Sequence, residues 1–412
     1  MNEEKYIETI TINDYFELQD IIQGRGDYKD FRGIFIYRGI NKKSYDLIPS
    51  SLRNNNILDY LDWRGDVPFS ADPFNEIDGL ILSQLCYVNL DGAVSDSFDE
   101  EISIPDAYRR YRPDLIDPKS TILTFEQDNL LFRKLAESRR FRGTMLRGYV
   151  SEKQHAEDMQ FAALTYRLGD GSGFTAFRGT DGSVVGWKED FTISYMQMTS
   201  GQERAITYLN HAFEGSECPI RVGGHSKGGN SAIYSSLFCD ESIRKRITNI
   251  YSFDGPGFRD EILNSETYKE MLPRIRSFIP EASIVGMLLG SGSDPTIVKN
   301  SAIGIKQHYA YNWELKRNRF LLADRLKKSG DVINRAISGM LDDLSDTERQ
   351  IFSDALFEIL RAPDKDTLKE IAKLKSYPSI IKAISNLRPE QQAVMKTAFK
   401  KIAQNGTGAF FK

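Results

Sequence analysis

The pentapeptide GHSKG at residues 224–228, with its serine at Ser226, restricts the fold of this chain more than any other segment. It follows the strand-like residues 219–223 and precedes residues 229–238, which are compatible with a helix. Small residues two positions before and after a serine let a strand and a helix approach closely, while the hydroxyl projects from a strained turn. We therefore expect a nucleophile elbow at Ser226. A glycine-rich turn that only packs is the alternative interpretation.

Strand-like and helical segments alternate around this pentapeptide. Residues 161–166 and 174–177 flank a glycine-rich turn and predict a hairpin, and residues 247–253 and 276–279 predict two further strands. Strands that alternate with helices favour a mainly parallel sheet that is flanked by helices. The predicted fold class is therefore α/β.

The chain divides by pattern into three regions. Residues 1–54 form a short N-terminal unit or arm, residues 55–314 carry the α/β domain, and residues 315–412 show helical patterns alone. Within the α/β domain, the charged residues 95–158 predict a helical insertion. A capping box at residues 345–348 predicts the start of a helix in the C-terminal helical domain.

Composition and charge exclude several classes of protein. The 412 residues are 40% hydrophobic and 27% charged, as in an ordinary globular protein. A formal net charge of −4 gives no electrostatic reason to expect nucleic acid as a partner. The N-terminus lacks the apolar stretch of a secretion signal, and no apolar run approaches the roughly 18 residues that a transmembrane segment needs. We expect a cytoplasmic protein.

The three cysteines, Cys86, Cys218 and Cys239, have no paired spacing. This pattern predicts neither a disulfide framework nor a zinc cluster. We expect reduced packing residues, and we expect neither a metal nor a cofactor in the site.

An activated serine needs a base, which is normally a histidine oriented by a carboxylate. The chain has four histidines, and in a fold of this kind the base follows both the serine and the acid. Only His308 meets that condition. His155 and His211 lie upstream and are expected on the surface or on a helix face, and His225 is expected to pack or to position its neighbours.

The acid is chosen from the carboxylates between Ser226 and His308. Asp254 ends the apolar run 250–253 and begins a Gly-Pro-Gly turn, which places it at the carboxyl edge of the predicted sheet. Asp294, in a turn rich in glycine and serine, is the alternative acid. Asp254 could instead cap the turn that follows it.

Acyl transfer also needs N–H donors that are directed at the developing oxyanion. The backbone N–H after the nucleophile belongs to Lys227. A second N–H is expected from Thr180, in the residues that follow the strand 174–177. A simple exit from that strand is the alternative interpretation of Thr180.

Several further motifs resemble a family of largely uncharacterised bacterial proteins that are built like the class 3 lipases. The matching residues cover about 57–313 and comprise 74–78, 82–84, 160–163, 176–181, 186–190, 224–230, 252–258, 283–288, 307–308 and Trp313. The resemblance implies an α/β-hydrolase core with Ser226 as the nucleophile, His308 as the base and Thr180 in the oxyanion loop. Residues 182–200 occupy the place where such lipases carry a lid, and ordinary packing over the sheet is the alternative interpretation.

One departure from that family concerns the acid. Class 3 lipases carry it after the next strand, where this chain has residues 283–285 and no carboxylate. Residues 253–256 instead resemble the acid position of pancreatic-type lipases, so Asp254 is preferred. Asp294 or a Ser-His dyad remains the alternative. More weakly, residues 37–39 and 47–53 resemble the start of an FRG domain.

These features predict a serine hydrolase that cleaves a carboxylic ester of a lipid or an acylated metabolite through an acyl-enzyme. A hydrolase-fold binding or regulatory module without turnover is the alternative, and a protein partner is not identified. The lysines of the C-terminal region are expected to form a solvated face, with a peripheral membrane contact as the alternative: Lys369, Lys373, Lys375, Lys382, Lys396, Lys400 and Lys401.

Overall fold

The computed structural model describes most of the chain after the first 55 residues. The described residues are 56–116, 124–154, 159–180, 188–189, 191–292, 294–327, 339–341, 343–363 and 377–410. The N-terminal unit expected at residues 1–54, with its FRG-like motifs, lies outside them. Residues 182–187, at the start of the expected lid, also lie outside them.

A single eight-stranded sheet, whose strands pair in chain order, forms the centre of the molecule. The strands are β1 (Ile102–Ser103), β2 (Met145–Gln154), β3 (Met159–Arg167), β4 (Gly173–Phe177), β5 (Ile220–His225), β6 (Ile247–Phe253), β7 (Ile275–Pro280) and β8 (Thr296–Val298). Pairs from β1 to β4 are antiparallel, and pairs from β4 to β8 are parallel. The predicted hairpin and the predicted mainly parallel α/β sheet are confirmed.

The register of the parallel strands brings their carboxyl ends to one edge of the sheet. Phe177 of β4 lies opposite Gly224 of β5, His225 of β5 opposite Phe253 of β6, and Phe253 opposite Phe278 of β7. The loops that follow these strands therefore start side by side. Sites in open α/β sheets assemble at such an edge.

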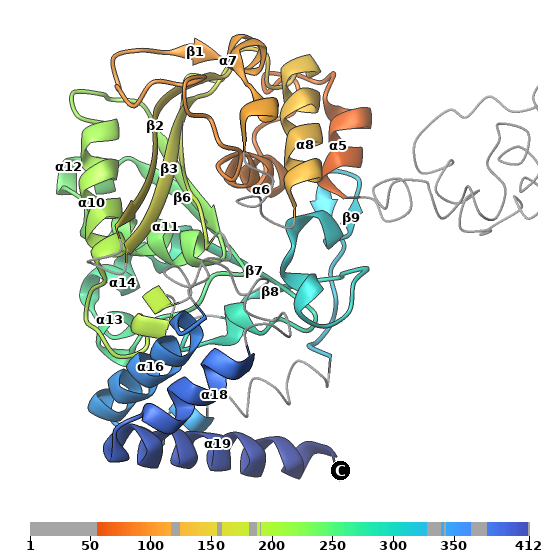
Figure 1. Ribbon diagram of the computed structural model, residues 1–412. Helices are drawn as coiled ribbons and strands as arrows, with labels where there is room; N and C mark the ends of the chain where they lie inside the picture. Colours follow the sequence, from red (N-terminus) through yellow and green to blue (C-terminus); the bar gives the residue numbers. More distant parts are fainter. Residues whose placement is uncertain are drawn as a thin grey trace, which may run out of the picture.

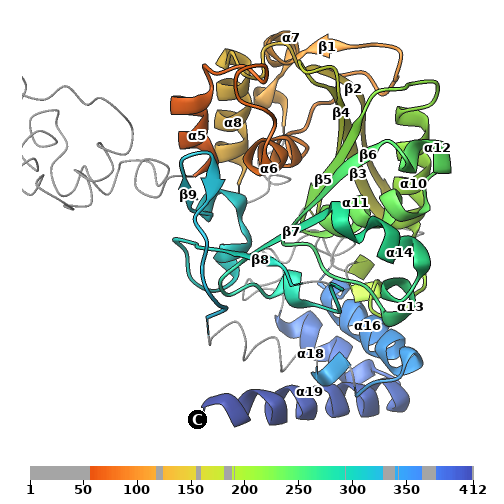
Figure 2. The same ribbon diagram turned by 180° about the vertical axis from the view of Figure 1, so that it is seen from behind.

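Helices cover both faces of the sheet (Figures 1 and 2). The helices α5 (Ile57–Arg64), α6 (Glu76–Leu85) and α8 (Phe125–Glu137) lie on one side, and α10 (Ser200–Ala212) and α11 (Lys227–Phe238) lie on the other. Each face has its own buried core, because side chains alternate along a strand. Phe174 and Ala176 of β4 join the core beneath α6, whereas Phe177 joins the core beneath α10 and α11.

The helical insertion expected at residues 95–158 is only partly correct. The segment contains α7 (Ile104–Arg110) and α8, but it also contributes β1 and the ten-residue strand β2. The sequence of β2 has little β-branched character, so local propensity does not reveal it. Its pairing with β3, from Met145 opposite Arg167 to Gln154 opposite Met159, makes it a strand.

Short elements connect the main ones. The short helices are α12 (Glu241–Arg244), α13 (Asp260–Leu263) and α14 (Glu266–Met271), and the 3-10 turns are η3 (Pro113–Leu115), η4 (Leu272–Arg274), η5 (Val285–Met287), η6 (Gly304–His308) and η7 (Ala310–Asn312). The strands β9 (Leu315–Lys316) and β10 (Arg319–Phe320) form a hairpin. The expectation of helices alone after residue 314 is therefore wrong for residues 315–320. Leu315 and Phe320 of this hairpin are buried in the core beneath α6.

The C-terminal helices α16 (Asp346–Arg361), α18 (Tyr377–Asn386) and α19 (Pro389–Phe410) gather at one end of the molecule (Figure 1). The predicted capping box at the start of α16 is confirmed, since Ser345 accepts from the N–H of Glu348 and the Glu348 side chain accepts from the N–H of Ser345. These helices have their own buried core, against which Phe191 also packs. None of the described helices is both long and apolar enough to cross a membrane.

The lysines of this region do not behave alike. Lys382, Lys396 and Lys400 are exposed, whereas Lys401 pairs with Asp343 at 2.7 Å. The others, at positions 369, 373 and 375, lie outside the described residues. The exposed lysines agree with a solvated face, and a membrane contact stays a prediction.

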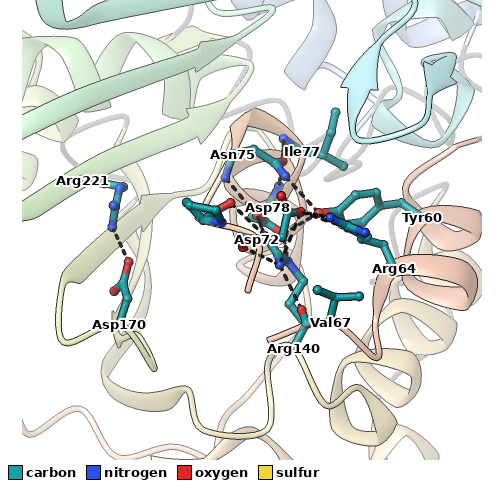
Figure 3. Close-up of polar contacts among 11 residues, drawn as sticks. Tyr60, Arg64, Val67, Asp72, Asn75, Ile77, Asp78, Arg140, Asp170 and Arg221 are labelled. Carbon is teal, nitrogen blue, oxygen red and sulfur yellow. Dashed lines mark hydrogen bonds and ion pairs between the residues drawn. The ribbon is translucent and has the colours of Figure 1, made fainter. Parts of the chain in front are cut away.

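A buried ion pair fastens α6 to the segment after α8 (Figure 3). Arg140 donates from Nε and Nη2 to the two carboxylate oxygens of Asp78, at 2.7 and 2.5 Å, and both side chains are fully buried. Arg140 also donates to the carbonyl oxygens of Val67, Asp72 and Pro73. These bonds satisfy the guanidinium, so its burial is compensated.

Substitution of Asp78 by asparagine is expected to lower the free energy of unfolding by about 3–5 kcal/mol, because buried Arg140 would lose its two-oxygen partner and keep only the carboxylate of Asp72, at 3.8 Å. Urea denaturation measures the loss. Asp114→Asn, which breaks the exposed pair with Arg112, is the matched control and should cause no measurable loss. Equal stability of the two variants would contradict the assignment of a structural role to the buried pair.

Candidate active site

Ser226 occupies a sharp turn between the end of β5 and the start of α11. Its φ of 59° and ψ of −135° lie in a region that L-residues rarely adopt. The turn is held on both sides, because the N–H of Ser226 donates to the carbonyl of Phe253 at 2.9 Å and the N–H of Gly229 donates to the carbonyl of Ser226 at 2.8 Å. The chain therefore has the strand–turn–helix geometry that the pentapeptide predicts.

Two glycines make this turn sterically feasible. A Cβ on Gly224 would lie 2.1 Å from the carbonyl oxygen of Gly228, and a Cβ on Gly228 would lie 2.0 Å from that of Phe177. Both contacts involve backbone atoms, which cannot rotate away. β4, β5 and α11 can meet this closely only where side chains are missing.

Asp254 follows β6 directly and is 1% exposed. Its backbone, at φ 53°, is held by donation from its N–H to the carbonyl of Phe278 at 2.8 Å. Its Oδ1 accepts from the hydroxyl of Ser283 at 2.5 Å and from the N–H of Gly286 at 3.1 Å. One carboxylate oxygen is thus fixed by the segment after β7, which leaves Oδ2 for another partner.

That partner is His308, at the end of η6. The distance between His308 Nδ1 and Asp254 Oδ2 is 2.6 Å. A carboxylate at Nδ1 holds the proton there, so Nε2 is the nitrogen left to exchange a proton with a hydroxyl. Asp294, the alternative acid, is exposed in its turn. The structure thus brings His308 to Asp254.

Neighbouring polar groups fix the loop that carries His308. The carbonyl of Gln307 accepts from Asn300 Nδ2 at 2.8 Å and from the indole N–H of Trp313 at 3.0 Å. The Gln307 side chain accepts from the N–H of Ala282 at 3.0 Å. Because these partners are buried, the position of the imidazole is defined by the core.

The loop after β4 passes directly beside the serine. A Cβ on Gly179 would lie 2.6 Å from the carbonyl oxygen of His225 and 2.7 Å from Cβ of Ser226. Thr180 is the next residue, so the structure brings the expected oxyanion loop to the elbow. Lys227 is the first residue of α11, and the first N–H groups of a helix have no partner within it.

The side chain of Lys227 leads away from the turn into a buried ion pair. Its Nζ donates to the carbonyl of Gln160 at 2.7 Å and to the carboxylate of Glu189 at 2.5 Å. Glu189 is 3% exposed and also accepts from the N–H groups of Gln160 and Gly201. Both charges are therefore compensated, and the start of α11 is joined to β3 and to the start of α10.

Three contributors to this geometry were not identified from the sequence. Tyr87 hydrogen-bonds His225, and Ser283 and Gly286 hold Asp254. Ser283 stands where class 3 lipases carry their acid, and this position is the signal that could have pointed to it. Tyr87 gives no local signal, since it lies far from the elbow in sequence.

Thiols and side chains of metal-ligating types also lie outside this geometry. Within the part of the chain that the structure describes, no group of three or more His, Cys, Asp or Glu residues could hold a metal ion. Burial raises the pKa of the Cys86 and Cys239 thiols to about 12, so both stay protonated at neutral pH. They are packing residues here.

Gly228→Ala is expected to lower the free energy of unfolding by about 1–3 kcal/mol, because its Cβ would collide with the backbone of Phe177. Thermal denaturation measures the loss. Gly143→Ala is the matched control, since Gly143 is exposed and a Cβ there meets nothing within 4 Å. If the two variants have the same melting temperature, the close approach at the elbow is not needed for stability.

Comparison with known proteins gives one family and a distant structural similarity. A family model described as Mbeg1-like matches residues 135–358, which is more than half of the chain. The crystal structure of M37 lipase is 14% identical with a TM-score of 0.33, over 52% of this chain and 70% of that chain. No curated protein matches the sequence. The family match spans the elbow, Asp254 and His308.

Proposed function

The chain belongs to the Mbeg1-like family, and we propose that it is a serine hydrolase that cleaves a carboxylic ester through Ser226, His308 and Asp254. The observation that carries the proposal is the 2.6 Å contact between His308 Nδ1 and Asp254 Oδ2, at the sheet edge where the elbow presents Ser226. The parts that acyl transfer needs are a strained serine after β5, a buried carboxylate after the adjacent strand β6, and an imidazole from the loop after β8.

The proposed reaction proceeds in two stages. Ser226 Oγ attacks the carbonyl carbon of the ester while His308 Nε2 takes the hydroxyl proton, and the same proton then passes to the departing alcohol. Water, deprotonated by His308, next attacks the acyl-enzyme and releases the carboxylic acid. The N–H groups of Lys227 and Thr180 stabilise the oxyanion of each tetrahedral intermediate.

Asp254 holds His308 in the productive tautomer and stabilises the imidazolium that forms during each step. Its carboxylate is suited to this role because Ser283 and Gly286 occupy Oδ1, so Oδ2 can point only at the histidine. The substrate is an ester of a lipid or of an acylated metabolite. The chemistry proposed here uses no metal and no cofactor.

An active-site fluorophosphonate should label the wild-type protein, and Ser226→Ala and His308→Ala should both lose the label. Ser226→Ala removes the attacking oxygen, and His308→Ala removes the base that activates it. Circular dichroism of each variant controls for folding. A well-folded wild type that resists labelling, also in detergent, would contradict the proposal and favour the binding or regulatory module.

The assignment of the acid is tested by two substitutions of the same kind. Asp254→Asn should lower kcat for p-nitrophenyl esters by on the order of 10⁴-fold, because the amide would stabilise the wrong imidazole tautomer. Asp294→Asn, at the exposed alternative position, should leave kcat unchanged. The reverse result would make Asp294 the acid, and full activity of both variants would indicate a Ser-His dyad.

A further inference from the structure

His225 lies directly before Ser226, yet its ring is held by other groups. Its Nδ1 lies 3.0 Å from the hydroxyl oxygen of Tyr87, and its Nε2 lies 2.7 Å from the carbonyl oxygen of His308. The residue is 4% exposed, and its ring centroid is 4.6 Å from that of His308. His225 therefore connects the elbow to the loop of the proposed base.

The partners of His225 determine which of its nitrogens carries hydrogen. A carbonyl oxygen can only accept, so Nε2 must donate to His308. In a neutral ring Nδ1 is then an acceptor, and the Tyr87 hydroxyl donates to it at 3.0 Å, in preference to the carbonyl oxygen of His225 at 3.3 Å. Burial, reinforced by the neighbouring His308, lowers the pKa of His225 to about 3 despite the opposing effect of Asp254. The ring is thus neutral at pH 7.

Tyr87 extends this connection to the loop after β4. Its hydroxyl oxygen accepts from the N–H of Gly179 at 3.1 Å. Burial raises the pKa of Tyr87, so the hydroxyl keeps the proton that it donates to His225. A Cβ on Gly179 would lie only 2.4 Å from the Tyr87 oxygen, so the loop and the tyrosine fit closely.

We infer that Tyr87 and His225 are positioning residues that join the Gly179–Thr180 loop, the Ser226 elbow and the His308 loop through three consecutive hydrogen bonds. The inference rests on the proposed function, because it concerns the relative placement of its nucleophile, base and oxyanion donor. Each of the three loops follows a different element, and these bonds keep them in one arrangement.

The neutral state of His225 matters for the proposed reaction. During acyl transfer His308 becomes an imidazolium, and a second positive charge 4.6 Å from its ring would oppose that step. A neutral imidazole donates to the backbone of His308 without such repulsion. A misplacement of about 1 Å at a catalytic group can lower a rate by on the order of 10²-fold. A fixed position of the loop that carries His308 is therefore expected to favour the reaction.

The tautomer can be tested without an assay of activity. Nitrogen NMR of protein with ¹⁵N-labelled histidine at pH 7, with the His225 signals assigned by their loss in His225→Gln, should show Nε2 protonated and Nδ1 unprotonated. A doubly protonated ring, or a proton on Nδ1 alone, would overturn the inference. This result is independent of whether the protein turns over an ester.

The positioning role is tested by ester kinetics. His225→Leu should lower kcat by on the order of 10²-fold with a smaller change in KM, because the carbonyl of His308 loses the N–H donor that holds its loop. His225→Gln should recover much of the loss, since its amide N–H can reach the same carbonyl. Tyr87→Phe should also lower kcat, whereas His211→Gln, on the exposed face of α10, should not.

Melting temperatures of all variants separate positioning from folding. Equal kcat for His225→Leu and wild type, or equal impairment of His225→Leu and His225→Gln at equal stability, would overturn the positioning role. Absence of turnover in a folded wild type would count against the proposed function, and the NMR measurement would still decide the hydrogen-bond arrangement. The two failures are therefore distinguishable.

Discussion

The close approach of β4, β5 and α11 around Gly224 and Gly228 is the constraint on which the rest of the site depends. Neither glycine could carry a side chain without collision with the backbone. The approach forces Ser226 into a left-handed, strained conformation, and the hydrogen bond from its N–H to Phe253 ties that strain to β6. The same contact places the residue after Phe253 beside the elbow, where Asp254 stands.

The position of the proposed acid follows from this arrangement. Asp254 ends the strand adjacent to that of the serine, and the segment after β7 supplies Ser283 in place of a carboxylate. With a carboxylate at Asp254, the hydroxyl of Ser283 becomes its hydrogen-bond donor, so the two segments cooperate in orienting His308.

The sequence predicted those features that are set by local pattern. The elbow, the hairpin around β3 and β4, and Asp254 at a strand end all follow from residues that are neighbours in the chain. The strand β2 could not be recognised, because its pairing with β3 outweighs a weak local propensity. Tyr87 was missed for a similar reason, since its partners Gly179 and His225 lie 92 and 138 residues away.

A nonpolar side chain after the nucleophile would fill space as well as Lys227 does, and it would avoid the cost of burying a charge. The ion pair with Glu189 instead links the start of α11 to the segment that leads into α10. That segment is in turn held by α16, through Lys188 with Asp354 and through Arg349, which donates to the carbonyl of Ser194. Since Lys227 carries a proposed oxyanion donor, these contacts connect α16 to the proposed site.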